Sequence, residues 1–524
     1  MTTTKTNLDA LFPAPYPPPS PLSPGRWPGI TQDSTLALGR LLKENHEKWH
    51  IFFNDMHFHN HTSHHLLAIY YLGASPDLLD AAYQTHVSRM RPARKSPDPI
   101  TSKNFHQHLG DENFYSGYLE FFSAVLLEKG AAATIEEYIF SPYANILAPE
   151  LGKPPMKMLN RFLSGIFHPL IHTGYGVEFG LPGMVAEGLA QTAVHGPGGL
   201  TLVRPSLFQY ASSISSDVIN AAVNRLTKLM PSLVLESAQH ALRFQHKPAQ
   251  DGVHALTILS RILHDPAFSL AAIGLPVPDD SEENAFEHVV RVRGEAIVAH
   301  AEAWSVDGTS PEEVARKTEE IIWMNVMLYG VCGWSAREKS TNGKFKPDFF
   351  FMHMVTSVLF LHSLTAYLTP TSSTILLRTY LINALTWWVA RGRPVPPLRA
   401  FFSSPDAPTA HPTEARAHPA PARDALVCAD PSPNPWLPLL QTALVHPDDH
   451  LCKLQRALAH FAALYGATPK GHFAALAEGD APLEGAGEMD GTLFVRAAGL
   501  TADALGWMRE GDERRSWDFG GFYA

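Results

Sequence analysis

The sequence predicts an all-α fold, and three observations favour it. Alternating strand patterns are nearly absent from the 524 residues, and only 200–203 reads as a possible strand. Helix start and stop signals recur, such as Ser75-Pro76 before one apolar run and Gly130 after another. The chain is 45% hydrophobic and 18% charged, so it can bury a large core. We therefore expect one large multi-helix domain with a histidine-lined central cavity.

Each expected helix rests on apolar residues at helical spacing between such signals. The two most apolar helices fall in the second half of the chain, and Arg391-Gly392-Arg393-Pro394 ends the later one. The expected helices lie at 31–53, 66–72, 75–89, 111–129, 134–140, 155–179, 181–195, 218–230, 232–244, 253–264, 282–304, 311–329, 348–368, 372–390, 436–464 and 501–509.

The domain boundaries follow from composition. Residues 1–30 are a Pro-rich extension, which we expect to lie over the surface of the main helical domain at 31–402. The Ala/Pro-rich insertion at 403–435 is expected to be disordered, because it cannot bury enough apolar surface to offset ordering. Residues 436–524 are expected to add helices and an aromatic tail, 517–523, that packs back on the main domain.

The totals exclude several classes of function. A formal charge of −10 gives no basic surface for nucleic acid. Three widely spaced cysteines provide neither a disulfide framework nor a zinc-thiolate motif. The start of the chain lacks the apolar region of a signal peptide, and no run of 18 apolar residues suggests a membrane span. We expect a cytoplasmic protein without membrane or nucleic-acid partners.

Histidine is the unusual component, with 27 residues, and three apolar segments carry it. In GIFHPLIHTGYGVEF, at 165–179, His168 and His172 are four apart and share a helix face, which begins or kinks near the intervening proline. The other segments are FHNHTSHHLLAIYYLGA at 58–74 and DFFFMHMVTSVLF at 348–360. Two neutral imidazoles on one face can bind a divalent metal. We predict that the three segments converge.

Each histidine also has an interpretation without a metal. Residues 57–65, at the start of the segment that continues to 74, hold five histidines in nine residues, too many for one ion, and His61 and His65 would share one helix face. His353 lies in the very apolar FFFMHMV, where burial requires a neutral ring or a partner. A metal, a backbone carbonyl or a buried acid would each satisfy it.

Other catalytic motifs are weak or missing. His46 to His50 reads H-E-x-x-H, but its polar flank favours a solvated helix face over a zinc protease site. The sequence has no GxGxxG, GxxxxGK[ST] or GxSxG motif. Cys332 is expected to fill the core.

The three histidine segments, with LLRTYLINALTWWVARGRP at 376–394, resemble the questin oxidase-like family from about residue 30 to 400. The resemblance implies oxidative ring opening of anthraquinone-type intermediates in fungal aromatic polyketide pathways. Some members are described as Baeyer–Villiger-type oxidases that use NADPH. At least one resembles a non-haem iron dioxygenase, whose iron is held by four histidines and a carboxylated lysine.

Carried over to this chain, the resemblance implies a Fe²⁺ site. The expected ligands are His61, His168, His172 and His353, with His65 and His254 in reserve. The chain departs from the family in having no lysine between Lys346 and Lys453. Tyr380 stands where the carboxylated lysine would be, so it becomes a candidate site residue that could supply the missing negative charge.

The resulting hypothesis is an oxygenase that cleaves a ring of an aromatic polyketide with O₂ at a histidine-held iron. One alternative is an NADPH-dependent Baeyer–Villiger-type oxidase. Another is a non-catalytic helical protein that binds a flat aromatic ligand, with its histidines bonded to phenols.

Overall fold

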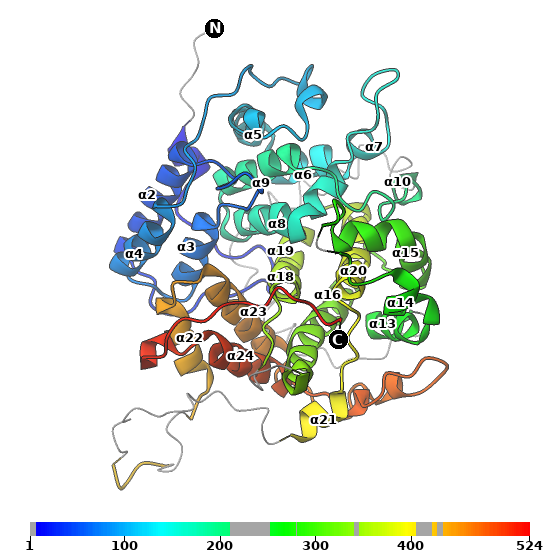
Figure 1. Cartoon of the computed structure of the whole chain (residues 1–524). Coiled ribbons are helices and arrows are strands. Elements are labelled where there is room, and N and C mark those ends of the chain that lie inside the picture. The colour runs from blue at the N-terminus through cyan, green and yellow to red at the C-terminus, as the bar shows by residue number, and fades with distance from the viewer. Residues whose placement is uncertain are drawn as a thin grey trace.

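Helices account for almost all regular structure in the computed structural model (Figure 1). The model describes residues 7–209, 252–278, 280–339, 345–404, 422–426 and 433–523. Among these residues the only strand pairing is three isolated bridges, and the possible strand at 200–203 is a turn. The predicted all-α fold is therefore confirmed. The helices expected at 218–230 and 232–244, and most of the insertion expected at 403–435, lie outside the described residues.

The helices have the following bounds: α1 Leu8–Leu11, α2 Gln32–Lys48, α3 Thr62–Tyr71, α4 Pro76–Val87, α5 Tyr115–Lys129, α6 Ala131–Ile135, α7 Pro142–Asn145, α8 Met158–Phe179, α9 Pro182–Val194, α10 Ser206–Gln209, α13 Ala255–His264, α14 Leu270–Ile273, α15 Ala285–Ala301, α16 Pro311–Met327, α17 Gly333–Ser335, α18 Phe349–Val358, α19 Leu361–Thr365, α20 Pro370–Ala390, α21 Leu398–Ser403, α22 Trp436–Val445, α23 Asp449–Tyr465 and α24 Thr492–Leu505.

Local capping signals explain where several helices begin. The Ser75 side chain accepts a hydrogen bond from the backbone of Leu78, and Pro76 occupies the first turn of α4. Thr369 and Pro370 start α20 in the same way. The predicted helix at 31–53 is wrong at its end, because α2 stops at Lys48.

Helix α8 is broken just before its histidines. Its backbone is not helical from Ser164 to Phe167, and Gly165, Ile166 and Phe167 take left-handed conformations. The helix resumes with Pro169 in its first turn, where a missing N–H costs nothing. The predicted break near this proline is confirmed, and the break brings the backbone of Gly165 back beside His168.

The helices that carry the site pack on one another in the interior. Contacts join α3 with α8 and α23, and join α18 with α8, α16, α20 and α23. Both ends of the described chain lie on this body: Leu11 and Phe12 are buried, and the last described residues cross the front of the molecule over α23 and α18 (Figure 1). Within 517–523, the Trp517 side chain is buried and the Phe522 N–H donates to the Arg391 carbonyl at 2.8 Å.

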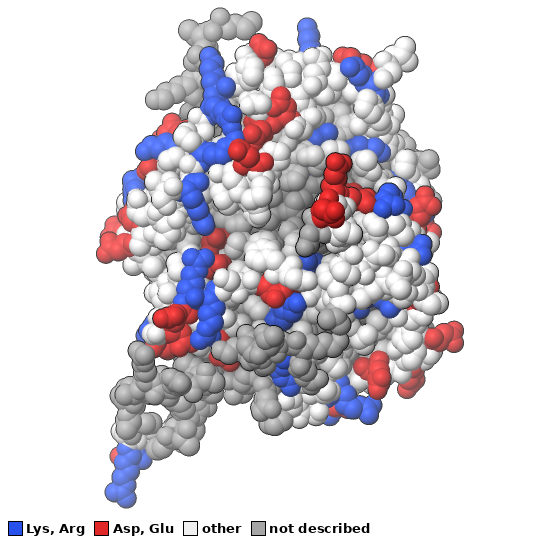
Figure 2. Space-filling model, in the orientation of Figure 1, with Lys and Arg blue, Asp and Glu red and all other residues white. Residues whose placement is uncertain are grey.

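The surface agrees with the charge totals. Figure 2 shows acidic and basic side chains interspersed on the face seen in Figure 1, without a continuous basic area among the described residues. None of the described helices combines the length and the hydropathy needed to cross a membrane.

Candidate metal centre

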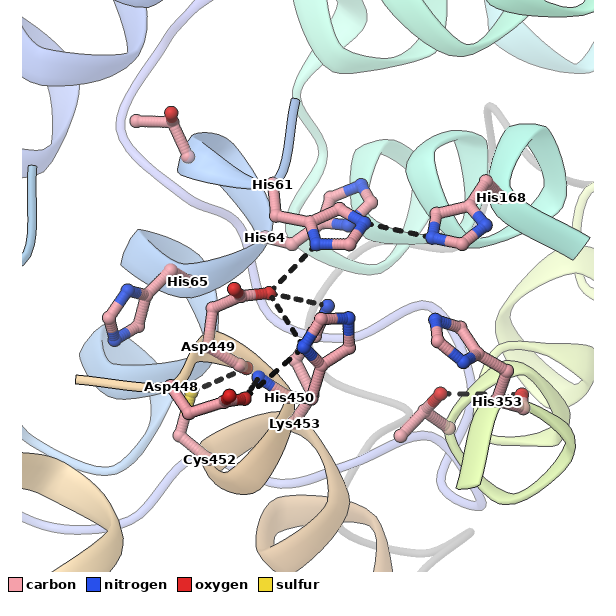
Figure 3. A network of polar contacts seen from close by, with 12 residues as sticks. His61, His64, His65, His168, His353, Asp448, Asp449, His450, Cys452 and Lys453 are labelled. Carbon is pink, nitrogen blue, oxygen red and sulfur yellow. Dashed lines mark hydrogen bonds and ion pairs between the residues drawn. The ribbon is translucent and has the colours of Figure 1, made fainter. Parts of the chain in front are cut away.

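Four histidines from four distant parts of the chain face one another, three of them buried and His450 partly buried (Figure 3). His61 directly precedes α3, and His168, His353 and His450 lie in α8, α18 and α23. The Nε2 atoms of His61 and His168 are 2.8 Å apart. The His353 ring centroid lies 4.8 Å from that of His168 and 5.2 Å from that of His450. The three segments that the sequence singled out do converge, and α23 adds a fourth.

The Nδ1 atom of each of these four rings points at an oxygen, which can only accept a hydrogen bond. His353 donates to a backbone carbonyl in its own helix at 2.7 Å, and His168 donates to a carbonyl at the break in α8. His61 and His450 lie 2.9 and 3.2 Å from carboxylates. The four oxygens belong, in the order His61, His168, His353 and His450, to Asp449, Gly165, Phe349 and Asp448. His168, His353 and His450 therefore donate through Nδ1, which leaves the Nε2 lone pairs free to face the other rings. For His61 the 2.9 Å ion-pair contact between Nδ1 and Asp449 favours the same tautomer.

These lone pairs lack a partner among the described residues. The buried Nε2 atoms of His353 and His450 have no hydrogen bond. The Nε2 atoms of His61 and His168 face each other at 2.8 Å with no proton between them in this tautomer. Two facing lone pairs repel unless a cation lies between or beside them, and metal–imidazole bonds are about 2 Å long. The donor arrangement thus fits a bound metal ion.

Burial keeps the rings of His61, His168 and His353 neutral. It lowers the pKa of His168 and of His353 well below the usual value, and neighbouring histidines lower it further. For His61, burial lowers the pKa to about 3, although Asp449 raises it. Neutral imidazoles bind metal without first losing a proton, so the cluster is prepared for a ligand role over the neutral pH range.

A carboxylate and a lysine complete this group. The Asp449 Oδ2 atom lies 2.9 Å from Lys453 Nζ, and both side chains are buried in the first turns of α23. Burial raises the Asp449 pKa, but the adjacent His450 imidazole, the Lys453 ammonium group and the hydrogen-bonding His61 imidazole outweigh this and hold it well below the usual value. The centre therefore has a fixed negative charge with a lysine beside it.

The position of Lys453 corrects the interpretation of Tyr380. The Tyr380 ring stacks on Phe167, with centroids 4.7 Å apart, but its hydroxyl lies 2.6 Å from that of Ser357 and 2.9 Å from the Met354 carbonyl. Burial also raises its pKa, which opposes an anionic form. The Tyr380 hydroxyl is thus hydrogen-bonded to residues of α18. The lysine beside the four histidines comes from α23.

The structure places His172 in a different set of contacts from His168. Its Nε2 donates to Glu187 at 2.7 Å, and its Nδ1 accepts from His64 at 3.0 Å. Glu187 also accepts a hydrogen bond from His46 at 2.7 Å. Both nitrogens of His172 are occupied, so the geometry does not support the predicted ligand role.

The remaining sequence candidates lie apart from the four rings. His65 Nδ1 is 3.0 Å from His86 Nε2, and His254 caps α13 by accepting from the Leu256 backbone. In the H-E-x-x-H stretch, His50 lies beyond the end of α2 and contacts backbone carbonyls, whereas His46 contacts Glu187. Neither a zinc protease site nor the expected solvated face is found.

Sequence reasoning missed the contribution of α23. The signal in HPDDHLCK was a pair of acids at a helix start, followed at once by a histidine and then by a lysine one turn on. It also passed over His59, which stacks on His168 with centroids 3.9 Å apart and, with His61, could help to hold an ion. Four nitrogen donors with a carboxylate suit iron, zinc or copper better than magnesium or calcium.

Known proteins are similar to this chain over the part that carries the four histidines. A sequence model of the questin oxidase-like family matches residues 58–458. The Baeyer–Villiger monooxygenase AacuH of Aspergillus aculeatus is 26% identical over 83% of this chain and 80% of its own length. The questin oxidase of Aspergillus terreus is 25% identical, over 80% and 79%. The Baeyer–Villiger monooxygenase dmxR6 of a Cryptosporiopsis species is 29% identical, over 63% of this chain and 64% of its own length, which is just under two thirds of that relative.

Proposed function

Because this chain belongs to the questin oxidase-like family, whose named relatives are oxidases and monooxygenases, we propose that it is an oxygenase that cleaves a ring of an anthraquinone-type aromatic polyketide with O₂. In this proposal His61, His168, His353 and His450 hold a non-haem Fe²⁺ ion. The observation that carries it is the common arrangement of the four rings: every Nδ1 lies against an oxygen, the Nε2 atoms of His61 and His168 face each other, and those of His353 and His450 have no hydrogen bond.

The chain's own groups have separate tasks. The Nδ1 partners fix the orientation of the rings, as the oxygen partners of metal-bound histidines generally do. The aromatic rings around the cluster exclude water: Phe349 lies 4.5 Å from His353 and 5.0 Å from His450, measured between centroids. Iron, when bound, would supply the one-electron chemistry that allows O₂ to react with a closed-shell aromatic substrate.

Two groups can offset the charge of the ion. Asp449 does so as a carboxylate beside His61 and Lys453. Lys453 would do so if its amine added CO₂ to give a carbamate, which is the ligand that the family resemblance implies. Intact mass measured under native conditions distinguishes the two, because a carbamate adds the mass of one CO₂ and disappears in Lys453→Arg. The carbamate is also supported if bicarbonate increases the iron affinity of the wild type but not that of Lys453→Arg.

The test of the proposal is metal content and oxygen balance. We expect the purified protein to bind iron at one ion per chain and to convert a hydroxyanthraquinone in ¹⁸O₂ without added reductant, with both oxygen atoms entering the product. A protein that converts the substrate at full rate after chelation of all metal contradicts the proposal.

The names of the relatives favour a second candidate, a Baeyer–Villiger-type oxidase that uses NADPH. Such a reaction inserts one oxygen atom of O₂ next to a carbonyl and reduces the other to water, with two electrons from NADPH. The same experiment separates the candidates: one ¹⁸O atom in the product and stoichiometric loss of NADPH support the second.

A further inference from the structure

Ten residues close to the end of the chain touch the supports of two of the four histidines. This tail, Arg514–Tyr523, lies outside the residues that the family model matches, 58–458. It crosses α23 and α18 as an extended segment (Figure 1), which are the helices that carry His450 and His353. Its contacts are therefore placed where they can influence the centre.

The first contact is with the carboxylate that orients His450. The Trp517 indole N–H donates to Asp448 Oδ1 at 3.1 Å, and the His450 Nδ1 atom lies 3.2 Å from the same oxygen. Arg514 approaches the other oxygen, Oδ2, at 3.1 Å. Asp448 is also the residue before α23, and its side chain accepts from the His450 backbone at 3.0 Å. The tail thus holds both oxygens of the group that fixes the His450 tautomer.

The second contact is with the residue that orients His353. The backbone N–H of Phe349 donates to the Asp518 carbonyl at 2.9 Å, and the Asp518 N–H donates to the Pro347 carbonyl at 2.9 Å. The Phe349 carbonyl in turn accepts the proton of His353 Nδ1 at 2.7 Å. Beyond the backbone, the rings of Phe519 and Phe349 lie 4.5 Å apart between centroids. A short parallel bridge between the tail and the start of α18 therefore sets the position of this carbonyl.

We infer that the C-terminal tail is part of the metal centre, with Trp517 as a positioning residue that sets the His450 imidazole through Asp448. The inference rests on the proposed metal site and goes beyond it, because it assigns a role to residues outside the matched span. Removing an outer partner of a metal-bound histidine typically weakens metal binding by roughly 10- to 100-fold. Trp517 is one contact further out, so the expected loss is about threefold to tenfold.

The matched pair of variants is Trp517→Phe and Tyr523→Phe. Each removes one hydrogen bond of the same tail, but the Tyr523 hydroxyl donates to the Ala390 carbonyl at 2.5 Å and does not touch Asp448. Co²⁺ is titrated into metal-free full-length protein, and both affinity and the visible ligand-field spectrum are recorded. We expect Trp517→Phe to bind about threefold to tenfold more weakly with a shifted spectrum, and Tyr523→Phe to match the wild type.

Additional variants protect the test against misfolding. Arg514 is half exposed, so Arg514→Gln should fold normally and weaken Co²⁺ binding by about twofold. In an Asp448→Asn background, Trp517→Phe should have little further effect, because the two residues act in series. Equal Co²⁺ binding by wild type, Trp517→Phe and Arg514→Gln overturns the role of the tail and leaves the metal site intact. Failure of the wild type to bind Co²⁺ or Fe²⁺ overturns the metal site itself.

Discussion

Two histidine groups lie side by side in this protein and use opposite hydrogen-bond patterns. In one, His64 donates to His172, and His172 donates to Glu187, so each link has one donor and one acceptor. In the other, His168 Nδ1 donates to a carbonyl, His61 Nδ1 lies 2.9 Å from the Asp449 carboxylate, and the Nε2 atoms of the two rings face each other at 2.8 Å. In the first group only the buried His64 Nδ1 lacks a partner among the described residues, whereas in the second group two lone pairs face each other in a geometry that fits a cation. Burial and proximity are shared by both, so the direction of the protons decides which group is the candidate metal site.

The largest effect is expected from a variant that disrupts the second histidine group. Replacing His353 by Ala removes a lone pair that has no other partner, so iron affinity should fall by more than about 100-fold. Metal analysis after dialysis against limiting iron measures it. His254→Ala is the control, since His254 caps α13 away from the cluster, and it should keep the metal.

The next variant breaks the first group instead. Glu187 accepts from both His172 and His46, so Glu187→Gln leaves one of these buried donors facing an amide N–H. We expect a loss of about 1–3 kcal/mol in the free energy of unfolding, measured with urea, and iron affinity within about threefold of the wild type. Loss of iron as large as that of His353→Ala would show that the two groups are one site.

A third prediction concerns a lone buried histidine. His362 Nε2 has no hydrogen bond, as in His353, and burial lowers the pKa of His362 to about 3. The unfolded chain binds a proton near pH 6.5 and the folded chain does not, so this residue lowers stability as the pH falls from about 6.5 toward 3.

When the pH is lowered from 7 to 5, the free energy of unfolding of the metal-free wild type should fall by roughly 2 kcal/mol more than that of metal-free His362→Leu. Urea unfolding at both pH values measures the difference. Parallel pH profiles of variant and wild type would contradict the shifted pKa.

The smallest expected effect concerns Tyr380. Tyr380→Phe removes hydrogen bonds to Ser357 and the Met354 carbonyl, and should reduce stability by about 1 kcal/mol. Because its hydroxyl is directed away from the four rings, iron content should not change. A variant that folds but loses iron would restore Tyr380 as a site residue.

Much of the fold was predictable because its signals are local. The Ser75-Pro76 start of α4 and the break before Pro169 depend on neighbouring residues, and both were read from the sequence. Burial of His353 was equally predictable, because its own helix is apolar on all sides. The end of α2 was not, since the chain leaves the helix to place the His50 ring against the Glu112 carbonyl far along the sequence.

The sequence by itself determined that this chain is helical and that His61, His168 and His353 are buried together. Only the tertiary structure decided which histidines have a free lone pair. His168 and His172 share one helix face. Both nitrogens of His172 are occupied, by Glu187 from α9 and His64 from α3, whereas the hydrogen-bond partner of His168 is a carbonyl of its own helix. Asp449 and Lys453 reach the cluster from α23 in the same way. The physical reason is that a hydrogen bond fixes a tautomer, and these partners come from helices that meet only on folding.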